Sequence, residues 1–341
     1  MTFNREIFTR ATRFLVFSIT GTVRSLSLMA TQRLQGALST ATLQAYDSMF
    51  RIFLAFLCFH GIFQSQVTVE IILAYLEFLF CSDKSVSVMR NHVSAIKWRL
   101  QNLGIDTSPW DDSRIAMYLK SVQRAGPLSF RLKPIITPAI LRSLITACDG
   151  TQMGFMYKAV YLLAFFSFLR LSNLVPHSLH SFDYLKHLTQ DDVFFRDRSA
   201  VILVKWTKTM QNKDQIKLIT IPKLNNLLCP VGALQEVLRL VPRRKNAPLF
   251  QILDNSAWIP LTDTRVRRHL HSILTVLGMQ ASGFTFHSFR RSGATFAFQN
   301  NVSLQNIKHH GTWSTECVWR YVLESADAGS EVASCFAKLL A

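Results

Sequence analysis

Arg170 stands where a permanent positive charge needs an unusual partner. It closes a strongly apolar segment, FFSFLRLSNL, and a guanidinium beside buried surface is costly unless it meets an anion. Acidic residues are sparse nearby, and Asn173 occupies a place where a partner carboxylate would be expected. The segment therefore predicts an anion site, with a core arginine in an internal ion pair as the alternative.

His287 and Arg290 lie three residues apart in the segment FTFHSFRRSGATF. One turn of helix, or the loop that leads into it, directs both side chains toward the same place. The histidine titrates near neutral pH and can exchange a proton, whereas the arginine keeps its charge. The pair thus predicts a site that binds an anion and moves a proton.

The other side chains that could take part in a reaction are Lys208, Trp313 and Tyr321. Lys208 lies just before a polar turn between two strand-like segments, and on its own it would be a solvated surface charge. Tyr321 on its own would be a half-buried core residue. The neighbouring His309 and His310 lack further ligands, so we expect no metal there.

The charge balance of the 341-residue chain indicates a polyanionic partner. Lysine and arginine number 38 against 21 acidic residues, which gives a net charge of +17 and a pI near 10.0. Nucleic acid is the usual partner for such an excess. With 49% hydrophobic and 17% charged residues, the chain can bury large cores, which excludes a disordered protein. The longest apolar run, 159–169, is too short to span a membrane, and the six scattered cysteines predict neither a disulfide framework nor a zinc site.

The pattern of helices and turns predicts a mainly α protein in several parts. A basic tail (1–35) precedes a helical bundle (36–125), and a basic linker (126–137) leads to a larger, mostly α domain (138–328) with a small antiparallel β-sheet. A short amphipathic helix occupies 329–341. The tail also resembles a targeting peptide in composition, which we keep as the lesser alternative. The first expected helix is capped within 39–42 and carries its apolar stripe at 46–57. The other expected helices cover about 68–80, 85–103, 111–124, a segment from 138, 156–174, 231–240, 263–277, 289–299 and 303–308, and the expected strands 192–195, 201–205 and 216–221.

Taken in order, the reactive residues read Arg–Lys–His–x–x–Arg–Trp–Tyr. This order, on a basic two-part chain, resembles the tyrosine recombinases (the phage-integrase family), and most of all those of eukaryotic mobile elements of the DIRS and Crypton kind. The likeness spans about residues 40–325 and rests on FLRLSNL, WTKTM, LCPVGAL, HSFRRSGAT and HGTWSTECVWRYV, with Trp313 placed 23 residues after Arg290 and 8 before Tyr321. The chain departs from the family pattern at Asn173, often an acid, and at Phe168, frequently a glycine.

The resemblance implies a DNA breaking-rejoining fold and DNA strand exchange without metal, ATP or other cofactor. Arg170 and Arg290 would clamp the phosphate, and His287 would bind it and accept the phenol proton. Tyr321 would attack to form a 3′-phosphotyrosine. The remaining catalytic candidates are Lys208, which would protonate the departing 5′-oxygen, and Trp313, whose indole N–H would reach a phosphate oxygen.

The expected partner is double-stranded DNA, bound by a homo-oligomer, a tetramer by family resemblance. The candidate DNA contacts, most of them expected to touch phosphates only, are Arg90, Lys97, Arg99, Arg131, Lys133, Lys205, Arg265, Arg267, Arg268, Arg291 and His310. For Arg291 a structural contact is the alternative. His269 and His271 are expected at the surface. The 329–341 helix is the candidate contact with a neighbouring protomer. The nucleus is the expected location if the host is eukaryotic, and the cytoplasm otherwise.

Three other classes of protein fit parts of this pattern. A domesticated relative would keep the fold and bind DNA without cleaving it, although the complete residue set argues against decay. A type IB topoisomerase would use similar chemistry to relax supercoils as a monomer. A basic scaffold protein without a site would leave the ordered set of residues as coincidence.

Overall fold

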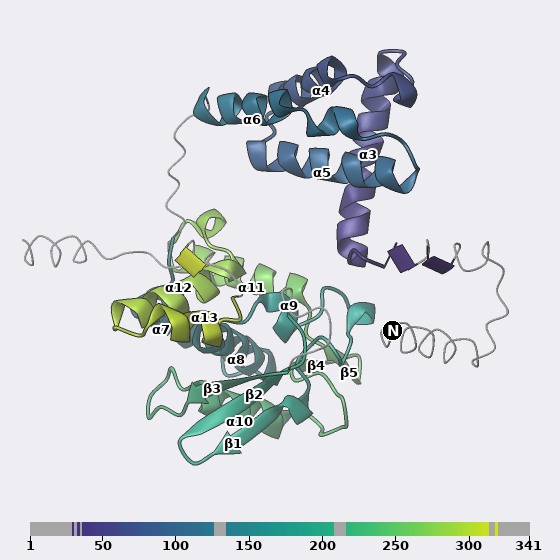
Figure 1. The fold of residues 1–341 in the computed structure, drawn as a ribbon. Helices are drawn as coiled ribbons and strands as arrows, with labels where there is room; N and C mark the ends of the chain where they lie inside the picture. Colours follow the sequence, from purple (N-terminus) through teal and green to yellow (C-terminus); the bar gives the residue numbers. More distant parts are fainter. Residues whose placement is uncertain are drawn as a thin grey trace, which may run out of the picture. The chain divides into compact units, whose positions relative to one another are not determined.

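The computed structural model describes residues 29–30, 33–34, 36–125, 134–207, 216–313 and 318–319. The described residues belong to two compact units, one ending at Ala125 and the other beginning at Pro134. Both are mostly helical, and the second also holds small antiparallel sheets (Figure 1). The fold class predicted from the sequence is confirmed. Within the described ranges, no helix is long and apolar enough to cross a membrane.

The first unit is a bundle of helices closed around aromatic side chains. Its α-helices are α3 (Thr40–Phe59), α4 (Val69–Cys81), α5 (Val86–Asn102) and α6 (Ser113–Ala125). Ser85 caps α5 by accepting a hydrogen bond from the Val88 amide, and Gly104 follows the helix with a φ of +71°, as the sequence predicts. In the core, the ring of Phe53 packs edge-on against Tyr75 and Trp110.

The second unit surrounds the buried helix α8. Its helices are α7 (Pro138–Thr146), α8 (Gln152–Ser167), α9 (Leu171–Leu174), α10 (Pro230–Leu240), α11 (Asp263–Val276), α12 (Phe286–Gln299) and α13 (Leu304–His310). Its strands are β1 (Val193–Arg196), β2 (Ser199–Val204), β3 (Lys217–Pro222), β4 (Gln251–Asp254) and β5 (Ala257–Pro260). The first three strands form one antiparallel sheet in the order β1-β2-β3, and β4 and β5 form a separate hairpin.

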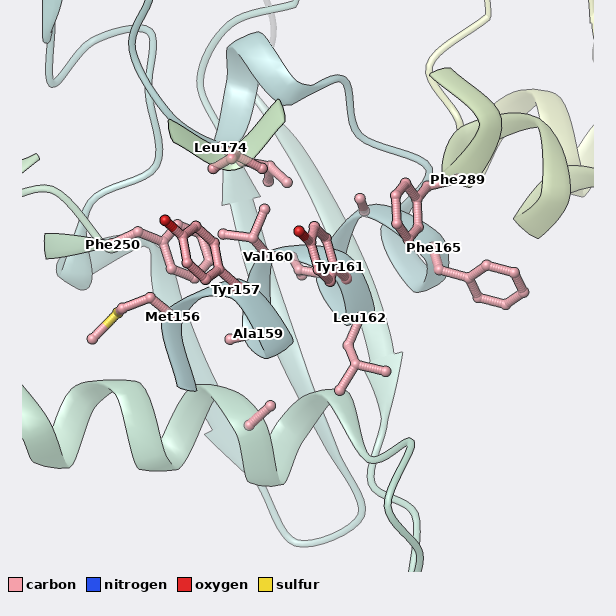
Figure 2. Close-up of a cluster of buried hydrophobic side chains, with 14 of the residues drawn as sticks. Met156, Tyr157, Ala159, Val160, Tyr161, Leu162, Phe165, Leu174, Phe250 and Phe289 are labelled. Carbon is pink, nitrogen blue, oxygen red and sulfur yellow. The ribbon is translucent and has the colours of Figure 1, made fainter. Parts of the chain in front are cut away.

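Helix α8 is apolar nearly all round because neighbours cover most of its sides. Figure 2 shows its aromatic and aliphatic side chains packed among residues from other elements, including Phe250 and Phe289. Tyr161 stacks on Phe289 of α12, with the ring centroids 5.3 Å apart. This contact fixes α12 against the centre of the unit.

The expectation that His269 is a surface residue is wrong. Its ring stacks on Tyr157 with the centroids 3.6 Å apart, and its Nδ1 lies 2.8 Å from the Tyr161 hydroxyl. Burial lowers the pKa of His269 to about 4, so the imidazole is neutral near pH 7. The histidine therefore joins α11 to α8 as a packing residue.

The helix expected over 156–174 is broken in two. Phe168 has a φ of 54°. This angle lies in the left-handed region, which ends a right-handed helix and which residues other than glycine seldom adopt. Helical structure then begins again after Arg170, which is the N-cap of the short helix α9. The break points the main-chain oxygen of Phe168 toward α12 instead of along α8.

Candidate active site

Arg290 is the centre of the candidate site. Its side chain is only 1% exposed. One guanidinium nitrogen donates to the carbonyl of Phe168 and the other to the carbonyl of Gly311, the latter at 2.6 Å. The guanidinium also lies over the indole of Trp313, 3.9 Å from the ring centroid, an arrangement that favours a cation. Two segments far apart in the sequence, at Phe168 and at 311–313, therefore hold this one charge.

A small apolar cluster supports the arginine. Phe168 and Trp313 pack with Ala294 of α12 and Ile307 of α13. His310 lies with its ring 4.7 Å from that of Phe168, and its Nε2 is 2.8 Å from the Phe166 carbonyl. Burial lowers the pKa of His310, which makes it a neutral structural residue near pH 7. The cluster keeps the Arg290 guanidinium in one orientation.

Arg170 lies two residues beyond the Phe168 carbonyl that Arg290 binds. The side chain is half-buried. Its Nη1 is buried and has no hydrogen-bond partner within the part of the chain that the structure describes. An unsatisfied buried donor of a charged group is unfavourable, so this nitrogen is available to an anion.

His287 stands on the first turn of α12, one turn before Arg290. This helix begins at Phe286, three residues earlier than predicted, because Thr285 and Ser288 form a capping box at its start. His287 is exposed, while Arg290 points into the protein. Lys208 and Tyr321 lie outside the described residues.

Sequence reasoning missed Lys217, the first residue of β3. It pairs with Val204 across the strands and is half-buried. Burial, together with the charge of Arg290, lowers the pKa of Lys217, which places this lysine near the buried arginine. Alternation along the strand contained the signal, since Lys217 shares a face with the buried Ile219 and Ile221.

The candidate DNA contacts of the first unit all lie on α5. Arg90 is exposed, Lys97 and Arg99 are half-buried, and each already has a partner within the unit. Surface pairs of this kind contribute little to stability and exchange readily. Their partners are Gln123 for Arg90, Asp111 for Lys97 and Asp47 for Arg99.

Helix α11 carries a second group of cations. Arg265 pairs with Asp254 of β4 at 2.8 Å, and Arg267 pairs with Asp263 one turn earlier at 3.2 Å. Arg268 is exposed. The helix therefore presents two exposed guanidinium groups, those of Arg267 and Arg268, and the half-buried one of Arg265.

Two further DNA-contact candidates, Lys205 and Arg291, make contacts within the second unit. Lys205 pairs at 2.7 Å with the buried carboxylate of Asp192, which also accepts hydrogen bonds from Thr189. Arg291 donates at 2.7 Å to the carbonyl of Pro134, near the end of the expected linker. Both side chains are thus used within the unit. Arg131 and Lys133 lie outside the described residues, and within the described part no cluster of three or more His, Cys, Asp or Glu could hold a metal.

The comparisons with known proteins address the fold and the family. No family model matches the chain. The integrase/recombinase xerD homolog of Selenomonas ruminantium is 25% identical over 309 residues, which are 87% of this chain and 85% of that protein. The Tn1549 transposon integrase in complex with transposon right-end DNA has a TM-score of 0.62 and 16% identity, with 92% of this chain and 98% of that one covered. A lambda integrase dimer bound to a COC′ core site has a TM-score of 0.55 and 15% identity, covering 90% and 97%.

The xerD homolog supports the resemblance of this chain to the tyrosine recombinases and integrases. At such low identity the solved structures show that the recombinase fold is shared. The departure from the recombinase pattern at Phe168 coincides with an unusual backbone angle. The family frequently has glycine there, and the left-handed φ of 54° at this position is one that glycine adopts without strain.

Gly293 brings α12 close to the Phe165 carbonyl of α8, and we expect Gly293→Ala to disrupt the site. The added Cβ would lie 2.6 Å from the Phe168 ring and would also overlap the Phe165 carbonyl, which is main chain and cannot turn away. Helix α12 would have to shift, at a cost of about 1–3 kcal/mol in the free energy of unfolding. Thermal denaturation would measure that loss.

Gly150→Ala is the matched control, because a Cβ at this exposed glycine meets nothing within 4 Å. A Gly293→Ala variant with the same melting temperature as the Gly150→Ala variant would contradict the close packing of α12 on α8.

Proposed function

We propose that this chain is a site-specific DNA recombinase or integrase of mobile-element origin, closest to the DIRS and Crypton kind. It cuts and rejoins DNA through a 3′-phosphotyrosine intermediate. Two neighbouring arginines carry the proposal. Arg290 is fixed by two main-chain carbonyls, and the buried Nη1 of Arg170 has no hydrogen-bond partner in the described chain. Two guanidinium groups of this kind suit the oxygens of one phosphodiester.

The reaction proceeds by two displacements at phosphorus. The phenol oxygen of Tyr321 attacks the phosphate, and His287 accepts the phenol proton. The bond from phosphorus to the 5′-oxygen breaks, and Lys208 gives that oxygen a proton. The 5′-hydroxyl of a second strand then gives its proton to Lys208 and attacks the phosphotyrosine. The bond from phosphorus to the phenol oxygen breaks, His287 returns the proton to the tyrosine, and the phosphodiester is restored.

The arginines stabilise both transition states. Negative charge grows on the nonbridging oxygens during each displacement, and donors that are already oriented toward these oxygens lower the barrier. Trp313 orients Arg290 through its indole face and contributes its N–H to the phosphate. The phosphotyrosine keeps the energy of the broken bond, so the cycle needs neither ATP nor a metal.

Binding to DNA rests on the net charge of +17. The surface cations of α5 and α11, together with Arg131 and Lys133, contact the phosphate backbone, and the binding constant consequently falls steeply with salt. A homotetramer on two duplexes, joined by the predicted helical segment 329–341, which lies outside the described residues, brings the exchanging strands together. The first unit acts as the core-type DNA-binding domain and the second as the catalytic domain.

The test of this function is a trapped covalent adduct. A random-site selection first identifies a duplex that the protein binds, and a nick in that duplex then prevents rejoining. We expect an adduct that survives denaturant and forms in the presence of EDTA without ATP. Specific binding with no adduct would instead indicate a silent DNA-binding relative, and relaxation of supercoiled plasmid without strand exchange would indicate a type IB topoisomerase.

A further inference from the structure

Asn173 is a buried amide that joins two parts of the second unit. Its side chain is 1% exposed, and its Nδ2 donates to the carbonyl of Trp206 at 2.8 Å. Its main-chain amide donates to the carbonyl of Arg170 at 2.8 Å, and its own carbonyl accepts from Leu188 at 3.0 Å. The residue is thus fixed on three sides, one of them the start of the helix that Arg170 caps.

The Trp206 carbonyl belongs to the exit of β2. Lys205, the residue before Trp206, is paired with the buried Asp192. Thr207, the residue after Trp206, is fully buried. The exit of β2 is therefore held from two directions, by Asn173 on α9 and by Asp192 ahead of β1. From Thr207 the chain runs on to Lys208.

The contact at Asn173 requires a hydrogen-bond donor. A main-chain carbonyl can only accept, and the asparagine amide supplies the N–H. An ionised carboxylate at the same buried position would face the Trp206 oxygen with no proton between them, which leaves two acceptors opposed. The asparagine that departs from the family pattern is for this reason not equivalent to an acid in this chain.

We propose that Asn173 is a positioning residue that holds the exit of β2 in a fixed place relative to Arg170. This inference rests on the proposed function, since it assigns the contact a role in DNA cleavage. Removal of the donor lets the two segments shift, so the cleavage rate falls while DNA affinity, which depends on the surface cations, is retained.

Asn173→Asp tests the donor requirement through its dependence on pH. Burial raises the pKa of a carboxyl group, so the aspartate is increasingly protonated as the pH falls and its O–H can then donate to Trp206. At pH 7.5 we expect adduct formation to be about 10- to 100-fold slower than in the wild-type chain, as for a small misplacement of catalytic groups. The ratio of variant to wild-type rates should rise toward one as the pH is lowered to 5.5.

Asn173→Ala and Ser172→Ala complete the experiment. The alanine at 173 offers no donor at any pH, so its rate ratio should stay low throughout, and it carries the test if the aspartate variant does not fold at pH 7.5. Ser172 is the exposed neighbour on α9, and its alanine variant should behave as wild type. Melting temperatures and DNA dissociation constants are measured for every variant.

The outcomes separate the two proposals. Wild-type cleavage with a folded Asn173→Ala variant that is equally fast, or with an Asn173→Asp ratio that does not change with pH, overturns the positioning role alone. A wild-type chain that forms no adduct on its selected site overturns the proposed function, and the positioning role with it.

Discussion

Tyr321→Phe is expected to abolish covalent attachment to a nicked duplex while leaving DNA binding intact. The substitution removes one oxygen atom, and that atom is the proposed nucleophile. The remaining ring has no group that can attack phosphorus, and no alternative hydroxyl is expected to take its place. The adduct, resolved from free protein on a denaturing gel, should fall below detection, a loss of more than about 10⁴-fold.

Tyr184→Phe is the matched control, because Tyr184 is an exposed tyrosine of the same unit. Its adduct yield should equal that of the wild-type chain. An undiminished adduct in the Tyr321→Phe variant would mean that another residue is the nucleophile, and would remove the chemical basis of the proposed mechanism.

Arg290→Lys is expected to slow cleavage by about 10²- to 10³-fold, the usual effect of losing one preorganised donor at a transition state. Lysine keeps the charge, but its single ammonium group cannot bridge the Phe168 and Gly311 carbonyls as the planar guanidinium does. One carbonyl is left unsatisfied in a buried place, so the free energy of unfolding should also fall by about 1–3 kcal/mol. Single-turnover cleavage at saturating DNA and thermal denaturation measure the two effects.

Arg142→Lys supplies the comparison, since Arg142 is an exposed arginine on α7. It should change neither the rate nor the melting temperature. If Arg290→Lys cleaved at the Arg142→Lys rate, Arg290 could not be the phosphate clamp, whatever its effect on stability.

Much of the fold follows from local signals that act within one or two turns. The left-handed glycine at Gly104 and the start of α7 at Thr137–Pro138 were predicted correctly because both depend on short-range backbone geometry. The three strands of the main sheet lie within a residue or two of their expected limits. The separate hairpin β4–β5 was missed, although its two-residue turn at Asn255–Ser256, with both φ angles positive, is the type that Asn favours.

The errors fall where tertiary contacts override the local pattern. The apolar run 159–169 is interrupted only by Ser167, which gave no reason to end the helix before Arg170. In the structure the Phe168 carbonyl leaves the helix and accepts from Arg290, a residue 122 positions away. The same holds for His269, whose partners Tyr157 and Tyr161 are more than a hundred residues away. Residue types alone cannot supply such long-range pairings.

In the candidate site, too, the sequence identified the residues but not all of their contacts. Arg170 and Arg290 were singled out from their sequence context and Trp313 through the family resemblance. The structure places Arg290 against Trp313 and next to the turn that leads to Arg170. Lys205 and His310 were proposed as DNA contacts and Arg291 as a DNA or structural contact, and the structure shows contacts within the protein for each. Charge predicts attraction to DNA, but the pairing of each cation depends on the fold.

The most direct test of the account is a structure of the chain covalently trapped on a nicked duplex, with the distances from both arginines to the linked phosphate measured. We predict that the guanidinium groups of Arg170 and Arg290 each lie within hydrogen-bond distance of nonbridging oxygens of one phosphate, and that this phosphate is bonded to Tyr321. A phosphate bonded to another residue, or one that contacts neither arginine, would contradict it.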